Sequence, residues 1–392
     1  MNQELWKKFD KLHSLPFSGH EGLAEFFEKE GIRFAAKDLG TWGQFFLARF
    51  GRSGGTVHVP VWLAGVFCAL AKDVSPKSIC DPWAGAGFLV EALREACQPE
   101  QALAFTQIQA EHEIGKVLVP EVSWQLGEPL GLLGAVIQEF DVVASILPMG
   151  ARSVNPLKVA TTSGENVELR DDLGNLVMVA ASLHLNSSGV GLFVVTPSFF
   201  SQRSVFRQFG VLGLGVQAAL ALPSGTFAPF TNIPAFLLVV GRKPTARMFV
   251  AQLSGDEKTN LQILDNLRQG HEGGTLELGR FVDPVSFTSL ETIRTAERFV
   301  EAERRFSAPA VKLAEFATTI NLGRFGDDFA FQPQENSLFI PLIGNSEVVD
   351  SLEDLTLKKQ NYAQVVIDPV RSNARFVARF LNCPSQGLNH RL

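Results

Sequence analysis

The chain has 392 residues, of which 46% are hydrophobic and 19% are charged, and its formal net charge is −6. This length predicts two or three domains that can each bury a core, and the composition excludes disorder over most of the chain. No apolar run reaches the roughly 18–20 residues that cross a bilayer, and the N-terminal sequence lacks the apolar segment of a secretion signal. We therefore expect a cytoplasmic protein with no membrane span.

The sequence lacks the residue patterns of several common functional sites. The four cysteines are far apart and form no CxxC pair, which is typical of reduced thiols in the cytosol. The seven histidines lack the spacing of zinc ligands, so we expect no metal site. No GxxxxGK[ST] loop occurs, which argues against ATP hydrolysis.

The hydrophobic pattern changes along the chain. Residues 1–54 form a predicted helical segment, with apolar side chains at helical spacing in residues 4–12 and 22–30. After a turn-rich break, a buried helix is expected to begin behind Pro60, and from residue 77 short apolar runs alternate with helical stretches. The expected strands are residues 78–80, 102–105, 142–146, 191–196, 216–222 and 236–240, and the expected helices are residues 89–96, 176–185 and 204–212.

This alternation predicts an α/β domain over residues 55–245. Its Rossmann-like, mostly parallel sheet would carry helices on both faces, and its last two strands would form an antiparallel hairpin. Residues 246–309 are expected to form a connecting region with a charged amphipathic helix at 288–306. Residues 310–392, with short strand candidates such as SLFIPLI and AQVVID, are expected to form a smaller α+β domain.

The sharpest local motif is the segment DPWAGAG, which runs from Asp81 to Gly87 between a predicted strand and a predicted helix. Gly85 and Gly87 have no Cβ atom, so the backbone can approach a ligand closely and can adopt positive φ. A short Gly-x-Gly segment alone leaves two interpretations open, a ligand-binding loop and a tight turn between strand and helix.

This motif resembles motif I of S-adenosylmethionine-dependent DNA methyltransferases of the adenine-N6 class, and in particular the modification subunits of type I restriction–modification systems. Three further segments resemble that family in the same order: GTVHVP at 55–60, SSGVGLFVVTPSFF at 187–200 and ALALPSGTFAPFTNIPAFLLVVGRK at 219–243. The resemblance covers about residues 50–245. It implies a methyltransferase-like sheet, S-adenosylmethionine as cofactor and a role in a restriction–modification or related defence system.

The resemblance also implies which residues border the cofactor: His58, Pro60, Asp81, Pro82, Ala84, Gly85, Gly87, Gln107 and Glu128. The family has a carboxylate after the second strand, where it accepts hydrogen bonds from both ribose hydroxyls. Here Gln107 and Ile108 occupy that region, and Glu111 follows a few residues later. A neutral amide accepts more weakly than a carboxylate, so we expect weak or absent binding of S-adenosylmethionine. Solvent exposure is the alternative interpretation of Gln107, Glu111 and Glu128.

In the family, the strand that carries the catalytic motif ends in Asn-Pro-Pro followed by Phe or Tyr. The target adenine is flipped into a pocket, where the Asn accepts a hydrogen bond from its amine and the aromatic ring stacks on the base. In this chain the four positions are Ile146, Leu147, Pro148 and Met149. Ile146 has no acceptor, and an unpaired amine in a dry pocket would cost about 1–3 kcal/mol.

We therefore expect a homologue that is weakly active or inactive but binds DNA. One alternative is an active adenine-N6 DNA methyltransferase that uses another acceptor. The second alternative is a nucleotide-binding oxidoreductase on a Rossmann-like sheet, although Val90 occupies the last glycine position of its GxGxxG motif.

The C-terminal segment resembles the target-recognition domains of type I specificity subunits. The similar pieces are LAEF at 313–316, SLFIPLIGNSEV at 337–348, LKKQNYAQVVID at 357–368 and ARFVARFLNCPSQG at 374–387. The resemblance implies double-stranded DNA as a partner, together with specificity or restriction subunits, and a chain that stops within this domain. The candidates for phosphate contact are Arg324, Lys358, Lys359, Arg371, Arg375 and Arg379, for which solvated surface is the alternative interpretation.

Overall fold

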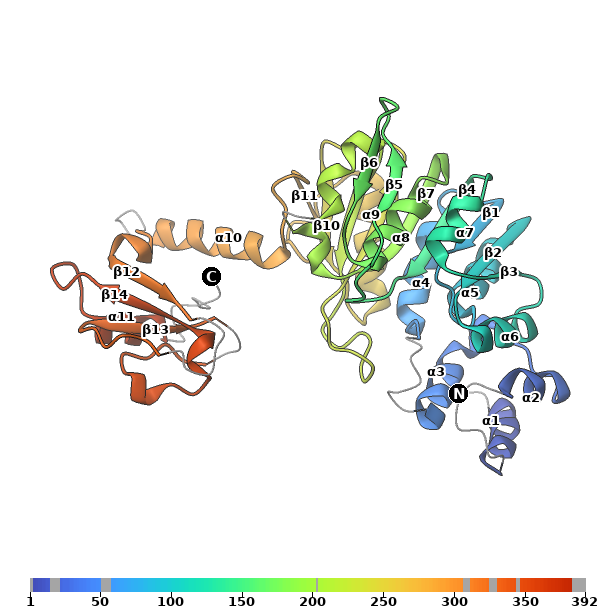
Figure 1. Ribbon diagram of the computed structural model, residues 1–392, viewed down its shortest axis with the longest axis horizontal. Coiled ribbons are helices and arrows are strands. Elements are labelled where there is room, and N and C mark those ends of the chain that lie inside the picture. The colour runs from blue at the N-terminus through green and yellow to red at the C-terminus, as the bar shows by residue number, and fades with distance from the viewer. Residues whose placement is uncertain are drawn as a thin grey trace. The chain divides into compact units, whose positions relative to one another are not determined.

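The computed structural model describes residues 3–14, 22–50, 58–201, 204–305, 311–323, 330–342 and 346–382 (Figure 1). The chain divides into two units, Met1–Leu290 and Glu291–Leu392. Among the described residues, no helix is both long enough and apolar enough to cross a membrane.

An aromatic cluster organises the N-terminal helices α1 (Gln3–Asp10), α2 (Leu23–Lys29) and α3 (Leu39–Phe50). The ring of Trp42 is fully buried and meets the rings of Phe9 and Phe27 edge-on, at centroid distances of 5.0 and 5.3 Å. The helices expected at residues 4–12 and 22–30 are thus confirmed. Phe34 contacts Phe88 at 4.8 Å, which joins this segment to the helix that follows the glycine motif.

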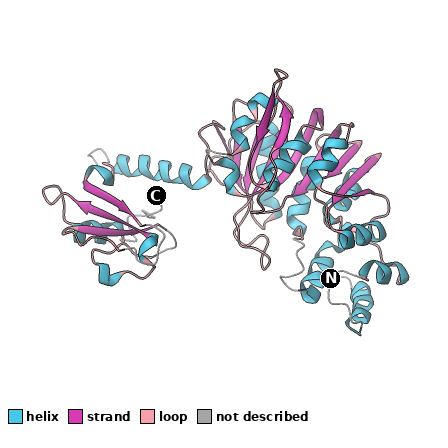
Figure 2. Ribbon diagram, viewed as in Figure 1, coloured by secondary structure: helices cyan, strands magenta, loops and turns pink. Residues whose placement is uncertain are grey.

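A nine-stranded sheet forms the centre of the first unit, in the order β11-β10-β8-β9-β7-β4-β1-β2-β3 (Figure 2). The strands β1, β2, β3, β4 and β7 are parallel to their neighbours in this group, and β10 is parallel to β8. The strands β9 and β11 run antiparallel. The bounds are β1 Ser78–Asp81, β2 Gln101–Thr106, β3 Ser123–Leu126, β4 Phe140–Ile146, β7 Leu185–Val195, β8 Gly215–Ala221, β9 Phe236–Gly241, β10 Met248–Gln252 and β11 Arg280–Val282.

Helices cover both faces of this sheet, as expected from the sequence. On one face, α4 (Val61–Lys72), α5 (Phe88–Cys97), α6 (Gln109–Leu118) and α9 (Glu257–Gln269) share one hydrophobic core with the N-terminal helices. Figure 1 shows α7 (Pro129–Ala135) and α8 (Leu173–Ser182) on the face turned to the viewer. The mostly parallel α/β sheet is therefore confirmed, and so is the antiparallel pairing of β8 with β9.

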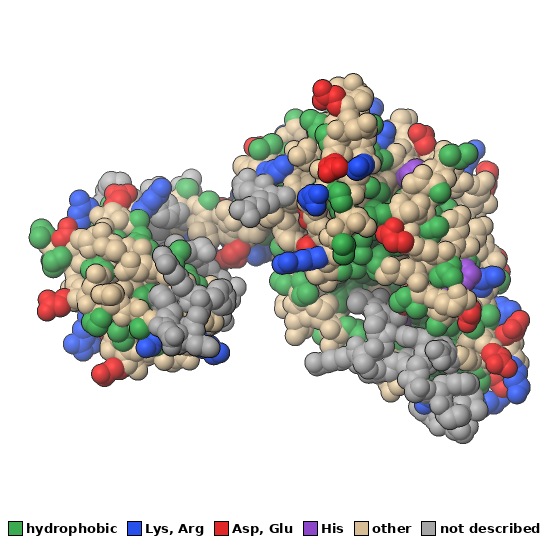
Figure 3. Space-filling view, viewed as in Figure 1, with side chains coloured by type: hydrophobic (Ala, Val, Ile, Leu, Met, Phe, Trp, Pro, Cys, Tyr) green, Lys and Arg blue, Asp and Glu red, His purple; other side chains and the backbone are tan. Residues whose placement is uncertain are grey.

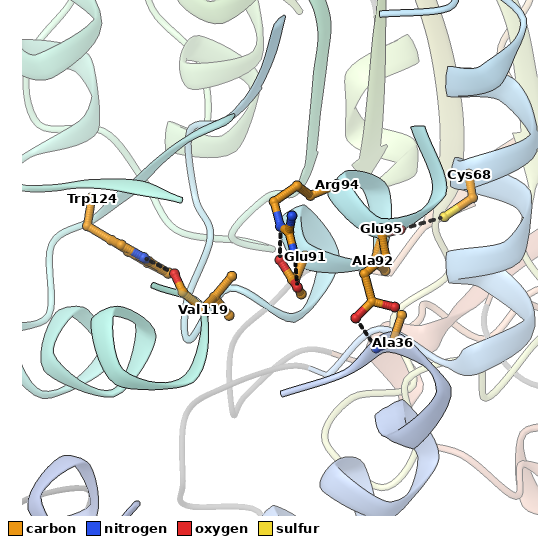
Figure 4. A network of polar contacts seen from close by, with 8 residues as sticks. All are labelled: Ala36, Cys68, Glu91, Ala92, Arg94, Glu95, Val119 and Trp124. Carbon is orange, nitrogen blue, oxygen red and sulfur yellow. Dashed lines mark hydrogen bonds and ion pairs between the residues drawn. The ribbon is translucent and has the colours of Figure 1, made fainter. Parts of the chain in front are cut away.

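The helix α5 is held by polar contacts on several sides (Figure 4). The guanidinium of Arg94 donates two hydrogen bonds to the buried carboxylate of Glu91, at 2.6 and 2.7 Å. The Glu95 carboxylate accepts the backbone N–H of Ala36 at 3.0 Å, and the Cys68 thiol donates to a carbonyl of α5 at 3.5 Å. These contacts fix α5, and with it the glycine motif, against α4 and the N-terminal segment.

Three parts of the unit differ from the sequence-based expectation. The sheet extends beyond residue 245, because β10 and β11 join it. A two-stranded hairpin of β5 (Leu157–Ala160) and β6 (Asn166–Leu169) follows β4. The helix expected at residues 204–212 is wrong, since the structure has two short 3₁₀ turns there, Val205–Gln208 and Gly210–Leu212. Gly213 ends the second turn with φ of +71°, where a helix cannot continue.

The second unit contains an antiparallel sheet in the order β12-β14-β13. Its strands are β12 Ala317–Leu322, β13 Ser337–Pro341 and β14 Tyr362–Ile367, and its helices are α10 Leu290–Arg305, which starts at the unit boundary, and α11 Ala374–Leu381. The helix α11 buries Ala374 and Ala378 against one face of the sheet. Phe339 and Tyr362 belong to a separate core cluster with Phe331. This α+β arrangement agrees with the strands expected near SLFIPLI and AQVVID.

Candidate functional site

A pocket of about 350 Å³ lies where the strands β1, β2 and β4 end. Three segments line it together, namely the glycine motif, the residues after β2 and the four residues 146–149 at the end of β4. Its wall consists of Val59, Asp81, Trp83, Ala84, Gly85, Ala86, Phe88, Leu89, Thr106, Gln107, Ile108, Glu111, Ile146, Leu147, Pro148, Met149, Thr231 and Ile233. The carboxyl ends of parallel strands are where α/β sheets bind ligands.

Asp81 is the last residue of β1 and places a carboxylate at this pocket while being only 1% exposed. Its Oδ1 atom accepts a hydrogen bond from the Ser145 hydroxyl at 2.7 Å and one from the Trp83 amide at 3.0 Å. Burial raises the pKa of Asp81 to about 7, against the lowering effect of these two hydrogen bonds. A cationic ligand group beside Asp81 would therefore stabilise its charged form.

The two glycines of the motif have different roles. Both adopt positive φ, +55° at Gly85 and +89° at Gly87, but only Gly85 lines the pocket. A Cβ atom on Gly87 would lie 2.7 Å from the ring of Trp124 in β3. Gly87 is thus required by its backbone conformation and by close packing, whereas the backbone of Gly85 borders the ligand space.

A carboxylate in the chain after β2 borders the pocket. Gln107 and Ile108 are exposed and line the pocket, and Glu111 lines it while being only 8% exposed. The Oε2 atom of Glu111 accepts a hydrogen bond from the Thr106 hydroxyl at 3.1 Å. Simple solvent exposure, the alternative interpretation of Glu111, is therefore wrong.

The four residues 146–149 form an apolar part of the pocket wall. Ile146, at the end of β4, and Met149 both pack against the main hydrophobic core. Leu147 is buried, and a Cβ atom on Gly174 would lie 2.7 Å from the backbone oxygen of Pro148, so α8 packs directly under this loop. Ile146 brings no side-chain acceptor to this part of the wall.

The loop between β8 and β9 contributes Thr231 and Ile233 to the pocket wall. This loop lies within the segment at 219–243 that resembles the family, but these two residues were not among the predicted site residues. The Thr231 hydroxyl accepts the backbone N–H of Ile233 at 3.1 Å, which shapes the loop tip. Periodicity carries no signal for such a loop, because its position depends on tertiary packing.

Five of the candidate cofactor residues do not line the pocket: His58, Pro60, Pro82, Gly87 and Glu128. The His58 ring packs on Phe46 and Phe88, while its neighbour Val59 lines the pocket. The carboxylate of Glu128 caps α7 by accepting the backbone N–H groups of Leu130 and Gly131, at 3.2 and 2.7 Å. A capping carboxylate is a structural feature of a helix N-terminus.

The basic candidates of the second unit are mostly exposed. Lys358 and Lys359 precede β14, and Arg375 and Arg379 lie one turn apart on α11. Arg371 donates to the backbone oxygen of Glu315 at 2.9 Å. Arg324 lies outside the described residues. On the face shown in Figure 3, Lys and Arg are interspersed with Asp and Glu, and contact with DNA stays a prediction for this unit.

The described ranges contain no group of three His, Cys, Asp or Glu side chains that could hold a metal ion. No protein-family model matches the chain, and no curated protein matches its sequence.

Comparison with solved structures shows what the fold resembles. The chain is similar to a protein described as the modification subunit of a type I restriction enzyme from Vibrio vulnificus, with a TM-score of 0.50 and 13% identity, over 70% of this chain and 63% of that one. It is also similar to a protein from Listeria monocytogenes described as a class I S-adenosylmethionine-dependent methyltransferase. The TM-score there is 0.52, with 16% identity over 68% of this chain and 97% of that one.

The chain thus spans 63% of the Vibrio subunit. At these identities the likeness is one of fold. It confirms the expected fold class, and it confirms the resemblance to modification subunits at that level.

Proposed function

We propose that the chain is an adenine-N6 DNA methyltransferase-like protein of a restriction–modification or related defence system, which binds double-stranded DNA and transfers methyl groups weakly or not at all. The observation that carries this proposal is that the glycine motif, the residues after β2 and residues 146–149 line one pocket. Specificity or restriction subunits are the proposed protein partners.

The pocket residues fit S-adenosylmethionine in kind and size. A volume of about 350 Å³ lies within the range of small-molecule sites, which is roughly 300–1,000 Å³. Asp81 would face the ammonium group of the methionine part, the backbone at Gly85 would border its chain, and Trp83 and Ile108 would provide apolar walls. The bound cofactor would supply an electrophilic methyl group on sulfur. Because Ile108 is aliphatic and Gln107 is neutral, we propose that binding is weakened.

The apolar wall at Ile146 is the proposed reason for weak or absent transfer. A target amine there would find no side-chain acceptor on Ile146, and Met149 offers no aromatic face on which a flipped base could stack. One positioned polar group in a transition state is commonly worth about 2.7–4 kcal/mol. The backbone carbonyl of Leu147 remains as an acceptor, so a low residual activity is compatible with this proposal.

The second unit is the proposed site of DNA contact. Arg375 and Arg379 are exposed on α11, and Lys358 and Lys359 are exposed just before β14. Such side chains contact phosphates and position a protein on the duplex without reading its sequence. We propose that residues 310–392 form a target-recognition-like domain and that residues 246–309 connect it to the methyltransferase-like domain.

The test is transfer of a labelled methyl group to duplex DNA, measured with the full chain and any specificity subunit. We expect little or no transfer by the unaltered protein and increased transfer by Ile146→Asn/Met149→Phe. The control is Ile137→Asn, because Ile137 is fully exposed and lies outside the pocket. Robust transfer by the unaltered protein would support an active enzyme instead. A parallel titration with NADH tests the oxidoreductase alternative.

A further inference from the structure

The outward face of α11 in the second unit consists of two arginines and two phenylalanines. In the helix sequence ARFVARFL, the exposed side chains are Arg375, Phe376, Arg379 and Phe380. The four other side chains belong to the core cluster of this unit or pack against it. Phe376 is 66% exposed and Phe380 is 37% exposed. Because a large exposed apolar surface is a mark of an interaction site, this face calls for a ligand.

The two exposed rings leave their faces available to such a ligand. Phe376 and Phe380 are one helical turn apart, and their rings are inclined by only 25° with centroids 6.5 Å apart. By comparison, the stacked rings of Phe9 and Phe45 in the N-terminal cluster are 4.0 Å apart. The rings on α11 are therefore nearly parallel without being closed onto each other. Flat groups bind such rings by stacking.

Hydrogen bonds from asparagine side chains hold both ends of this helix. At its start, Asn336 accepts the backbone N–H of Ala374 at 2.7 Å and donates to the carbonyl of Ser372 at 3.0 Å. At its end, Asn382 accepts the backbone N–H of Val348 at 2.9 Å and donates to the carbonyl of the same residue at 2.8 Å. The helix is thus positioned before any ligand arrives, which lowers the entropic cost of binding.

The charges of this face indicate which ligand complements it. The helix contains no carboxylate, and among the described residues neither Arg375 nor Arg379 has an ion-pair partner. An anionic chain that also carries flat apolar groups matches both kinds of side chain. A single-stranded nucleic acid is such a chain, because its phosphates are charged and its base faces are open. In a duplex the base faces are stacked on one another, and proteins reach the phosphates and the base edges.

We infer that α11 binds single-stranded nucleic acid, with Phe376 and Phe380 stacking on unpaired bases and Arg375 and Arg379 contacting phosphates. This inference goes beyond the proposed contact with duplex DNA, which uses only the charged side chains, and it does not depend on the pocket or on methyl transfer. Binding should tolerate any sequence, because every base offers a flat face.

The test is fluorescence anisotropy of the full chain with three labelled probes: a single DNA strand, an abasic strand of the same length, and the duplex of the same sequence. The unaltered protein should bind the intact strand about tenfold or more tightly than the abasic strand. Phe376→Leu/Phe380→Leu keeps apolar side chains but removes the rings. It should lose this factor with the intact strand and leave the affinities for the abasic strand and the duplex unchanged.

Two further variants separate the rings from the charges. Phe376→Tyr/Phe380→Tyr is the matched control, since it keeps both rings and should bind the intact strand as the unaltered protein does. Arg375→Gln/Arg379→Gln should weaken binding of all three probes. It should also reduce the slope of log affinity against log salt for the single strand by about 1.4, because each phosphate contact contributes about 0.7.

Three outcomes overturn the inference. The first needs no variant: equal affinity of the unaltered protein for the intact and the abasic strand shows that the bases are not bound. The second is unchanged binding of the intact strand by Phe376→Leu/Phe380→Leu. The third is binding to vesicles of phosphatidylserine and phosphatidylcholine without binding to the single strand, which assigns the face to a lipid surface. Binding of the intact strand with loss of this binding in the leucine variant, but no binding of the duplex, would support the inference and contradict the proposed duplex contact.

Discussion

The fold strongly raises the pKa of the Asp81 carboxyl group. Its ordinary pKa of 3.8 rises to about 7 because of burial, even though Ser145 and the Trp83 amide donate to it. The folded chain therefore binds this proton more tightly than the unfolded chain. It follows that Asp81 lowers the stability of the fold progressively as the pH rises from about 4 to about 7.

We predict that Asp81→Asn stabilises the unliganded protein at about pH 8 and has little effect near pH 4. The amide oxygen can still accept from Ser145 and from the Trp83 N–H, whereas the buried charge is gone. Since one pKa unit corresponds to about 1.4 kcal/mol, the gain at the higher pH is a few kcal/mol at most. Urea unfolding of both proteins at the two pH values measures it. An effect that does not change with pH would contradict the assigned cause.

The pair of Glu91 and Arg94 gives a second prediction. Glu91 is 3% exposed and receives two hydrogen bonds from Arg94, so Arg94→Met leaves a buried carboxylate without them. We expect a loss of about 2 kcal/mol or more in the free energy of unfolding, since removing one partner of a buried pair is costly. The control is Arg268→Met, because Arg268 pairs with Asp73 at a more exposed position and such pairs contribute about 0–1 kcal/mol.

The loss of stability on Arg94→Met should depend on pH. Burial raises the pKa of Glu91, and the hydrogen bond and charge of Arg94 oppose that rise. Without Arg94 the carboxyl should protonate more readily, and its neutral form costs less to bury. The destabilisation by Arg94→Met should therefore be smaller at about pH 5 than at about pH 8, which chemical denaturation at both values would show.

At the scale of elements, the ring of Trp124 in β3 connects α6 with the glycine loop. Its indole N–H donates to the Val119 carbonyl at 3.2 Å, and its ring lies against the backbones of Gly87 and Gly115. A Cβ atom on Gly115 would overlap this ring. The packing of β3, α6 and the loop thus depends on two positions without side chains.

We predict that Gly115→Ala destabilises the protein by about 1–3 kcal/mol, because the added methyl overpacks the core at Trp124. Gly65→Ala is the matched control in α4, where no atom lies within 4 Å of the added Cβ. That substitution should stabilise by about 0.5–1 kcal/mol, because alanine favours the helix. Thermal unfolding of the two variants should shift in opposite directions, and a shared direction would contradict this account.

The sequence predicted the inner strands well and the periphery poorly, for a physical reason. Strands such as β4 and β9 are buried on both faces and therefore appear as continuous apolar runs. The edge strand β3 is mostly exposed and lacks such a run. In the site, Asp81, Gly85 and Ile146 were indicated by the resemblance to the methyltransferase family, and each lies at or after a strand end. The burial of Glu111 and the position of Thr231 depend on tertiary packing, so no local pattern could indicate them.

For the whole molecule, the division into two units separates the pocket from the proposed DNA contacts. Every residue that lines the pocket lies between Val59 and Ile233, within the first unit. We predict that a fragment of residues 1–290 binds S-adenosylmethionine with the affinity of the full chain but binds duplex DNA much more weakly. Calorimetry and fluorescence anisotropy measure the two affinities. Equal DNA affinity of the fragment and the full chain would exclude a role for the second unit.

Phe88 couples the stability of the N-terminal helices to ligand binding in the pocket. It lines the ligand space and touches Phe34, Trp42 and Phe46, which belong to the N-terminal aromatic cluster. A ligand that binds only the folded pocket, at a concentration of about a hundred times its Kd, stabilises it by about 2.7 kcal/mol. The same free energy is added to the unfolding of any segment that the pocket needs for binding. Amide protons of α3 should therefore exchange more slowly with solvent when the pocket is filled, and those of α11 should not. Hydrogen exchange followed by mass spectrometry measures this difference. Slower exchange in α3 alone would show that the N-terminal helices support the ligand-binding pocket.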